Sequence, residues 1–424
     1  MNAFAILALL LTLAALFAYI NHRFIGLPST IGLTLLSLLL SVALVAANWL
    51  GLPLQAFAKG VLERVDLSRT LLDGALSFLL FAGALHVDWK VLHQERWSVA
   101  LLATGGVLLS TLLVAGMSHF LFGWLGFKVP FLICLLFGAL ISPTDPIAVL
   151  GLLKQANAPA SLATKIAGES LFNDGIGVVV FLLFYELQFS GDSELDLTHV
   201  GTLLLREAGG GIALGLALGW ATYRLLKSVD AYQVEVLLTL ALVSGGYELA
   251  KVLHTSGPLA IVVAGIVIGN AGRKFAMSDR TRQNLDTFWE LIDEILNALL
   301  FVVLGLEVLV LKYQPGFVTL GLLTIPLVLL ARVISVTAPG PVLKLFRQGF
   351  SWRNVVLLTW GGLRGAISIA LALTLPSGPE RDLLLAATYA VVAFSILVQG
   401  LTMPWLLGRV LPARNGEGDH ENGG

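Results

Sequence analysis

Long apolar runs separated by short polar loops dominate the chain. A helix needs about 20 apolar residues to cross the ~30 Å hydrocarbon core of a bilayer. With windows of that length we predict thirteen spans, at 3–20, 28–50, 70–87, 97–124, 130–153, 161–187, 200–227, 232–251, 257–271, 284–312, 317–345, 353–375 and 382–409. Of the 424 residues, 57% are hydrophobic and 12% are charged, which excludes a water-soluble domain of this size. The sequence predicts an all-α polytopic membrane protein.

Composition also excludes several other classes of protein. The single cysteine, Cys134, rules out a disulfide framework and a thiolate metal cluster. A net charge of −1 provides no basic face for nucleic acid, so no nucleic-acid partner is expected. No cofactor is expected either. We expect one membrane domain over residues 1–409, with a first helix that is retained rather than cleaved. Residues 410–424 form a short polar tail.

The distribution of basic residues predicts the orientation in the membrane. One side collects sixteen Lys and Arg residues in its loops and helix ends, and the other side collects eight. The richer side is expected to be cytoplasmic. With an odd number of spans, the C-terminus then lies inside and the N-terminus outside. Two of the 26 basic residues, Arg332 and Arg364, belong to neither side because they fall within spans.

Five charged residues lie inside predicted spans. Each requires a partner or a watery cavity, because a charge at membrane depth costs about 3 kcal/mol or more. They are Asp145, Glu169, Asp174, Arg332 and Arg364. They could be structural ion pairs, but such groups within a membrane more often mark an ion or proton pathway.

Two of the predicted spans are interrupted. In "LLFGALISPTDPIAVLGLL" (135–153), Pro143 and Pro146 remove helical hydrogen bonds from nearby carbonyls. In "TWGGLRGAISIALALTLP" (359–376), glycines surround Arg364. These are the fifth and twelfth spans, and their odd offset of seven means that they cross the membrane in opposite directions. This layout predicts an inverted repeat with two crossed discontinuous helices that meet near the midplane.

The two interruptions bring opposed helix ends together. Asp145 and Arg364 carry the charges needed to neutralise the dipoles of these ends, so we assign them mainly to helix-dipole compensation. Thr144 differs because its hydroxyl and its carbonyl are hard oxygen ligands of the kind that alkali cations take.

The sixth span carries the polar sequence "GESLFNDG" (168–175). At about 100° per residue, Ser170 and Asp174 share one helical face, and Glu169 and Asn173 share the neighbouring one. Glu169 and Asp174 point about 140° apart, so they are not expected to form a carboxylate dyad. We predict that Asp174 faces a cavity beside Ser170, and that Glu169 turns toward Arg332 or another cation.

Four motifs in this order resemble the sodium/proton antiporters of the NhaP and NHE type: "SPTDPIAV", "GESLFNDG", "FWELIDEILNALLFVVLGLEV" and "WGGLRGAIS". The similarity runs from about the third span to the end of the chain. The resemblance implies a homodimer with the NhaA/NhaP-like fold. Its dimerisation helices would be roughly 1–66 and 200–271, and its core ion-translocation helices roughly 67–187 and 284–409. One departure is Ala82, where many relatives carry a glutamate.

The resemblance also implies roles for individual residues. Asp174 would bind the ion and the proton, with Ser170 and Thr144 as Na⁺ ligands and Asn173 as the neutral member of an Asn-Asp pair. Glu169 would pair with Arg332. The expected activity is exchange of Na⁺ for H⁺ by alternating access, with both cations competing for Asp174. Because Asn173 is not a second acid, we expect one proton per cation and electroneutral exchange. The expected location is a bacterial inner membrane.

Other readings of these charges remain open. The exchanged cation could be Li⁺ or K⁺, because selectivity depends on fine ligand spacing. A cation channel would share the buried charges but would need a continuous polar pore. An intramembrane aspartyl protease could use Asp145 and Asp174, but the Gly-x-Gly-Asp context is missing. We therefore expect a transporter rather than an enzyme.

Overall fold

The structure is a computed structural model of the chain. It describes residues 3–50, 74–145, 160–189, 201–202, 205–309, 316–345 and 351–410, with the single residues 60, 149, 153 and 314. Within these ranges the ordered elements are helices, and no strand occurs. The fold class expected from the sequence is therefore confirmed.

The helices of the first half follow the predicted spans closely. They are α1 (Ala3–Ile20), α2 (Ser29–Trp49), α5 (Leu76–Leu85), α6 (Trp89–Gln94), α7 (Arg96–Leu101), α8 (Val107–Trp124), α9 (Phe131–Ile141) and α11 (Ala160–Phe189). A π-helical turn, Leu102–Gly106, joins α7 to α8, so the fourth span is continuous. The short α6 lies between the third and fourth spans. Its first turn is capped by Asp88, whose carboxylate accepts from the Lys90 amide at 2.7 Å.

The second half contains most of the remaining helices. They are α13 (Gly210–Leu226), α14 (Tyr232–Val252), α15 (Gly257–Val267), α16 (Arg273–Phe275), α17 (Asp279–Glu307), α18 (Phe317–Thr337), α19 (Gly340–Leu345), α20 (Trp352–Trp360), α21 (Ala366–Leu373), α22 (Pro379–Phe394) and α23 (Gly400–Val410). A π-helical turn, Ser395–Gln399, connects α22 to α23 and completes the last predicted span.

The described helices include seven that are long and apolar enough to cross a membrane, and two shorter apolar ones, α5 and α9. The long α17 is not among the seven. It is the helix that carries the motif beginning "FWELIDEILN", and its acidic residues reduce its hydropathy. If such a helix crosses the membrane, its polar face needs water or other helices beside it.

Both predicted interruptions are present. The first helix, α9, ends at Ile141, and residues 143–145 that follow are not helical. Residues 146–148, which include the predicted helix breaker Pro146, lie outside the described residues. The second interruption is complete: α20 ends at Trp360, residues 361–365 are extended or turn-like, and α21 begins at Ala366.

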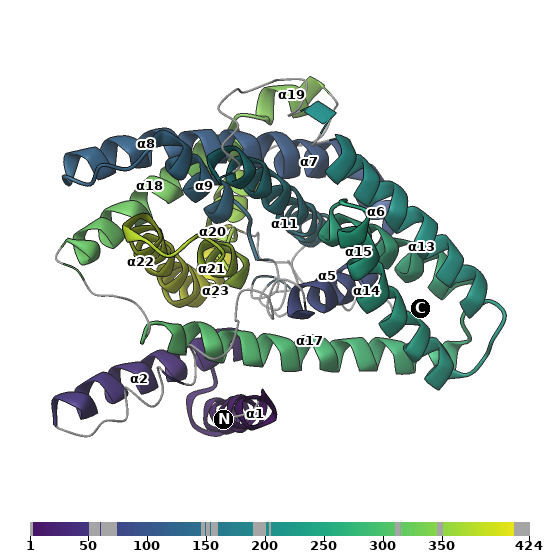
Figure 1. Ribbon diagram of the computed structural model, residues 1–424. Coiled ribbons are helices and arrows are strands. Elements are labelled where there is room, and N and C mark those ends of the chain that lie inside the picture. The colour runs from purple at the N-terminus through teal and green to yellow at the C-terminus, as the bar shows by residue number, and fades with distance from the viewer. Residues whose placement is uncertain are drawn as a thin grey trace, which may run out of the picture.

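Helix α17 runs along one side of the molecule and contacts helices from several parts of the chain. Figure 1 shows it below α5 and α21–α23, with α1 and α2 under its left part and α13–α15 near its right end. It packs on α2, α1, α5, α14 and α21. Helix α5 lies between α17 and α15 and packs on both. The division into dimerisation helices and core helices stays a prediction, since α5 and α17 contact helices of both predicted groups.

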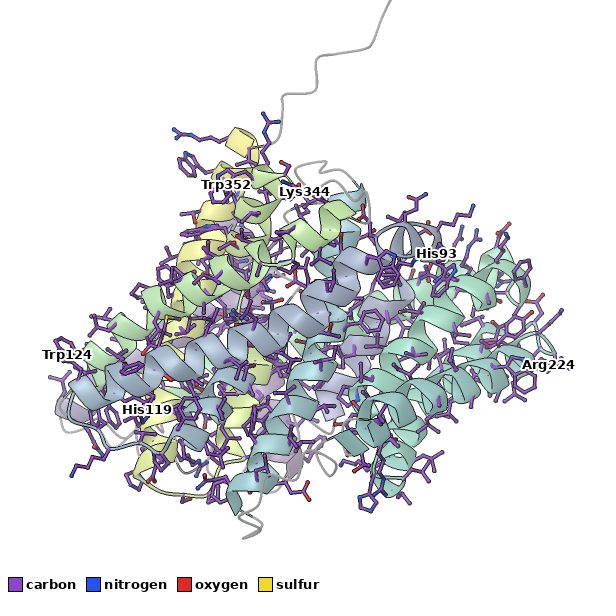
Figure 2. The ribbon with its side chains drawn as sticks, turned by 90° about the horizontal axis from the view of Figure 1, so that it is seen from above. His93, His119, Trp124, Arg224, Lys344 and Trp352 are labelled. Carbon is purple, nitrogen blue, oxygen red and sulfur yellow. The ribbon has the colours of Figure 1, made fainter. Side chains whose placement is uncertain are left out.

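Helices α8, α9, α18 and α22 form the opposite side of the bundle. Helix α8 packs on α9 and α18, and α18 also packs on α22. Helices α8 and α9 come very close at Gly138, where a Cβ atom would lie 3.0 Å from the backbone carbonyl carbon of Thr111. A side chain at Gly138 would therefore force the two backbones apart. Figure 2 shows α8 running from Trp124 and His119 toward the edge where His93 and Lys344 lie.

Candidate functional site

The two interrupted helices meet through their backbones. The amide of Asp145 donates to the carbonyl of Leu363 at 2.8 Å, so the first interruption is hydrogen-bonded to the second. Backbone groups released from a helix need such partners at membrane depth. The hydrogen bond therefore satisfies one backbone group of each interruption.

The side chain of Arg364 lies at the carboxyl end of α9. Its Nη1 donates to the carbonyl oxygen of Pro143 at 2.9 Å and also to that of Ser142. The Arg364 amide donates to Ser395 Oγ at 2.9 Å, which fixes the backbone beneath the guanidinium. A buried positive charge at this position opposes the negative end of the α9 dipole.

Asp145 lies against the amino end of α21. A Cβ atom on Gly365, the residue that precedes α21, would lie 2.7 Å from Asp145 Oδ2. The carboxylate can approach the start of α21 this closely only because position 365 is glycine. A negative charge is favourable at the positive end of a helix dipole.

Three buried polar side chains form a cluster between the first interruption and α11. Thr144 Oγ1 and Ser170 Oγ are 3.0 Å apart, and Asn173 Nδ2 donates to Thr144 Oγ1 at 2.8 Å. The Thr144 amide donates to Asn173 Oδ1 at 3.2 Å. Asn173 therefore contacts both the backbone and the side chain of Thr144. The pairing of Asn173 with Thr144 did not follow from helical geometry, which relates only residues of the same helix.

Asp174 lies one residue further along α11 and faces a cavity of about 520 Å³. Its side chain is buried, and its Oδ1 has no hydrogen-bond partner among the described residues. Leu171 and Ala167, one and two turns earlier on α11, line the same cavity. Asp145 and Pro143 contribute from the first interruption. Two aspartates therefore share one cavity, whose lining does not include Thr144, Ser170 or Asn173.

Glu169 points away from this cavity and contacts Arg332 of α18. The Arg332 Nη1 lies 2.5 Å from Glu169 Oε1, and the two side chains are 7% and 1% exposed, respectively. Arg332 Nη2 also donates to the Leu358 carbonyl at 3.1 Å. The pair joins α11 to α18 and α20, and Glu169 is separate from Asp174.

Glycines allow α11 to approach its neighbours. A Cβ on Gly175 would lie 2.7 Å from Leu259 Cδ2, and one on Gly177 would lie 3.1 Å from Pro143 Cδ. Gly177 therefore permits the proline of the first interruption to pack directly on α11.

The cavity also has a polar wall that the sequence interpretation missed. Helix α17 contributes Glu290, Asp293, Glu294 and Asn297 to the lining. Their spacing of three and four residues identifies one face of a helix and was visible in "WELIDEILNALL". What the sequence did not reveal was that this face lines the same cavity as Asp174. Ala82 of α5, the residue noted above as a departure from the resemblance, lines the cavity too.

Comparison with known proteins identifies the family. The profile described as "Sodium/hydrogen exchanger, transmembrane" matches residues 11–409. The chain belongs to the sodium/hydrogen exchanger family. It is 47% identical to the Na⁺/H⁺ antiporter NhaP of Pseudomonas aeruginosa, over 98% of this chain and 99% of that one. It is 35% identical to the Na⁺/H⁺ antiporter NhaH of Halobacillus dabanensis, over 90% and 92% of the two chains.

The fold of this exchanger-family chain is also similar to a solved structure. The sodium proton antiporter MjNhaP1 from Methanocaldococcus jannaschii matches with a TM-score of 0.76 over 98% of this chain and all of that chain, at 21% identity. The match supports the antiporter fold predicted from the two interrupted helices. Within the described ranges, no three His, Cys, Asp or Glu side chains converge as a metal site.

Proposed function

We propose that this protein exchanges Na⁺ for H⁺ across a membrane and that Asp174 carries both cations in turn. The observation that carries the proposal is the buried Asp174 carboxylate, which faces a cavity and has one oxygen without a hydrogen-bond partner in the described part of the chain. A bare carboxylate is strongly disfavoured in such surroundings, so it holds a proton or a cation. Two ligands that compete for one site are exchanged when that site alternates between the two sides of the membrane.

The cluster behind Asp174 supplies further oxygen atoms in this proposal. Thr144 and Ser170 would bind Na⁺ together with Asp174, and Asn173 would hold the Thr144 hydroxyl and amide in place. Their hydroxyls are bonded to one another rather than exposed in the cavity. Binding of Na⁺ would therefore require these hydroxyls to turn toward Asp174. The cation is cargo, and we propose that no resident cofactor takes part.

The other buried charges act as scaffolding in this proposal. Asp145 and Arg364 would compensate the dipoles of the crossed helices, because each lies at a helix end of opposite sign. Glu169 and Arg332 would join α11 to α18 as a structural pair. This division leaves Asp174 as the carboxylate that changes its cation during transport.

In the proposed transport cycle, the core ion-translocation helices move against the dimerisation helices of a homodimer. The N-terminus would lie outside and the C-terminus inside a bacterial inner membrane. The cavity mouth near His86 and Glu290 would then face the cytoplasm, since Lys90 and Arg96 follow on the same side. One carboxylate with a neutral Asn173 beside it predicts one proton per Na⁺ and electroneutral exchange.

The test is cation-dependent proton flux in proteoliposomes, with Na⁺, K⁺ and Li⁺ supplied in turn. Asp174→Asn should fold normally and should lose exchange, because an amide cannot release a proton or neutralise a cation. Asp174→Glu is the matched control and should retain part of the activity. Substantial Na⁺-dependent proton flux through Asp174→Asn would refute the assignment. Current without proton coupling at a clamped potential would instead indicate a channel.

A further inference from the structure

Helix α17 carries polar groups into the cavity along one face. Glu290, Asp293 and Asn297 follow at intervals of three and four residues, so they lie one above another. Their burial increases along this line: the Glu290 side chain is 61% exposed, Asp293 is half-buried, and Asn297 is 6% exposed. The line therefore leads from the surface into the interior on a different helix from the one that carries Asp174.

The cavity has an excess of negative charge. Its lining among the described residues contains five carboxylates and neither lysine nor arginine. Three of these carboxylates have compensation or solvent. Asp145 lies at the amino end of α21, Glu290 lies 3.8 Å from His86, and Glu294 is exposed. Asp174 and Asp293 remain, and neither forms a salt bridge to a described residue.

Asn297 gives a second and independent indication of a ligand. Its Nδ2 is buried and forms no hydrogen bond of acceptable geometry with a described residue, although the Asp293 carboxylate lies close enough to interact with it. A buried amide nitrogen without a well-formed hydrogen bond is energetically unfavourable. The nitrogen and oxygen of an amide exchange places by a half-turn, so this side chain can present either atom to the cavity. With its oxygen turned inward it would be a neutral ligand next to a carboxylate.

We propose that Asp293 and Asn297 form a second cation station, which holds a partly hydrated monovalent cation on the α17 wall before that cation reaches Asp174. A carboxylate and an amide oxygen are hard ligands that suit alkali cations. The proposal rests on the proposed function in that the cation held is the one exchanged at Asp174. The station itself is a separate binding site on a separate helix.

The kinetic test compares two neighbouring carboxylates on α17. In proteoliposomes of the full chain, Asp293→Asn should raise the Na⁺ concentration for half-maximal exchange about tenfold, with the maximal rate unchanged within about twofold. Glu294→Gln removes the same charge one residue away from an exposed position, so it should shift that concentration less than twofold. Asp293→Glu should keep most of the parent's affinity for Na⁺. Asn297→Ala should weaken the affinity for Na⁺ relative to the parent.

High ionic strength separates a binding station from general attraction of cations. In about 0.5 M choline chloride the screening length falls to roughly 4 Å, which removes attraction by exposed charges. The effect of Asp293→Asn should persist there, because a bound cation contacts its ligands. Equal shifts in Asp293→Asn and Glu294→Gln that vanish in choline chloride would overturn the proposal.

A binding measurement distinguishes this proposal from the assignment of Asp174. Broadening of the ²³Na resonance by purified Asp174→Asn should exceed that by the double variant Asp174→Asn/Asp293→Asn, both checked for folding by size-exclusion chromatography. Equal broadening by the two variants would exclude the second station and leave the role of Asp174 intact. Continued exchange by Asp174→Asn would instead refute the proposed function, while the difference in broadening would still decide the station.

Discussion

The buried pair of Glu169 and Arg332 provides a quantitative test of how the bundle is held together. Glu169→Gln removes the negative partner of the Arg332 guanidinium, which is almost fully buried. The guanidinium then keeps its hydrogen bond from Nη2 to the Leu358 carbonyl at 3.1 Å. The Arg332 Nε already lacks a hydrogen-bond partner among the described residues. An uncompensated buried charge costs about 3–5 kcal/mol, so we expect that loss in the free energy of unfolding.

The same reasoning predicts strong coupling between the two positions. Arg332→Gln leaves the Glu169 carboxylate buried without its cation and should cost about 3–5 kcal/mol as well. The double variant has no buried charge to compensate, so it should lose less than either single variant. The coupling energy should then be about 3 kcal/mol or more, well above the few tenths expected for independent sites.

The assay is a double-mutant cycle on the purified protein, with reversible unfolding in detergent followed by tryptophan fluorescence. The three variants and the parent are compared at one pH and one salt concentration. Losses that add within about 0.5 kcal/mol would show that the two side chains act independently. That result, or a loss below about 1 kcal/mol in Glu169→Gln, would refute the structural role of the pair.

Three further predictions concern the site and its supports. In the proposed function one proton and one Na⁺ compete for Asp174, so lowering the pH should raise the apparent KM for Na⁺ by up to about tenfold per pH unit at constant maximal rate. Initial rates of exchange over a grid of pH and Na⁺ concentration check this, and a falling maximal rate at constant KM would contradict it. Arg364→Met removes the donor to the Ser142 and Pro143 carbonyls and should reduce exchange more than tenfold, whereas Arg364→Lys should restore part of it; equal activity of both variants in proteoliposomes would argue against the charge at this position. Gly177→Ala should reduce both exchange and thermal stability because the added Cβ meets Pro143, whereas the Cβ added in Gly116→Ala meets nothing within 4 Å and should leave both unchanged. Indistinguishable melting curves would count against this packing.

The sequence predicted the broad fold because its strongest signals are local. A proline lacks an amide hydrogen, so the interruption near Pro143 follows from the residue itself. The divergence of Glu169 and Asp174 follows from helical geometry alone. In the structure Glu169 contacts Arg332, and Asp174 faces the cavity. The roles assigned to these residues stay predictions until variants are measured.

Other features could not be predicted because they depend on packing between distant segments. The hydrogen bonds from Asn173 to Thr144 depend on where the first interruption passes α11. The acidic face of α17 has a clear helical spacing, but a single helix does not show whether such a face meets water, lipid or a cavity. The lining shared by Asp293 and Asp174 is therefore a property of the assembled bundle.

The contact of Arg364 with the Ser142 carbonyl has a consequence for how the protein is made. The two residues are 222 positions apart, so during synthesis α9 enters the membrane long before its guanidinium partner exists. At about 5–20 residues per second the ribosome needs roughly 10–45 s to reach that arginine. Throughout this interval the first interruption, with Asp145, must be sheltered by water, lipid headgroups or the insertion machinery. A nascent chain that stops before the twelfth span would therefore keep the Ser142 carbonyl and the Asp145 carboxylate without the guanidinium that lies beside this break in the complete fold.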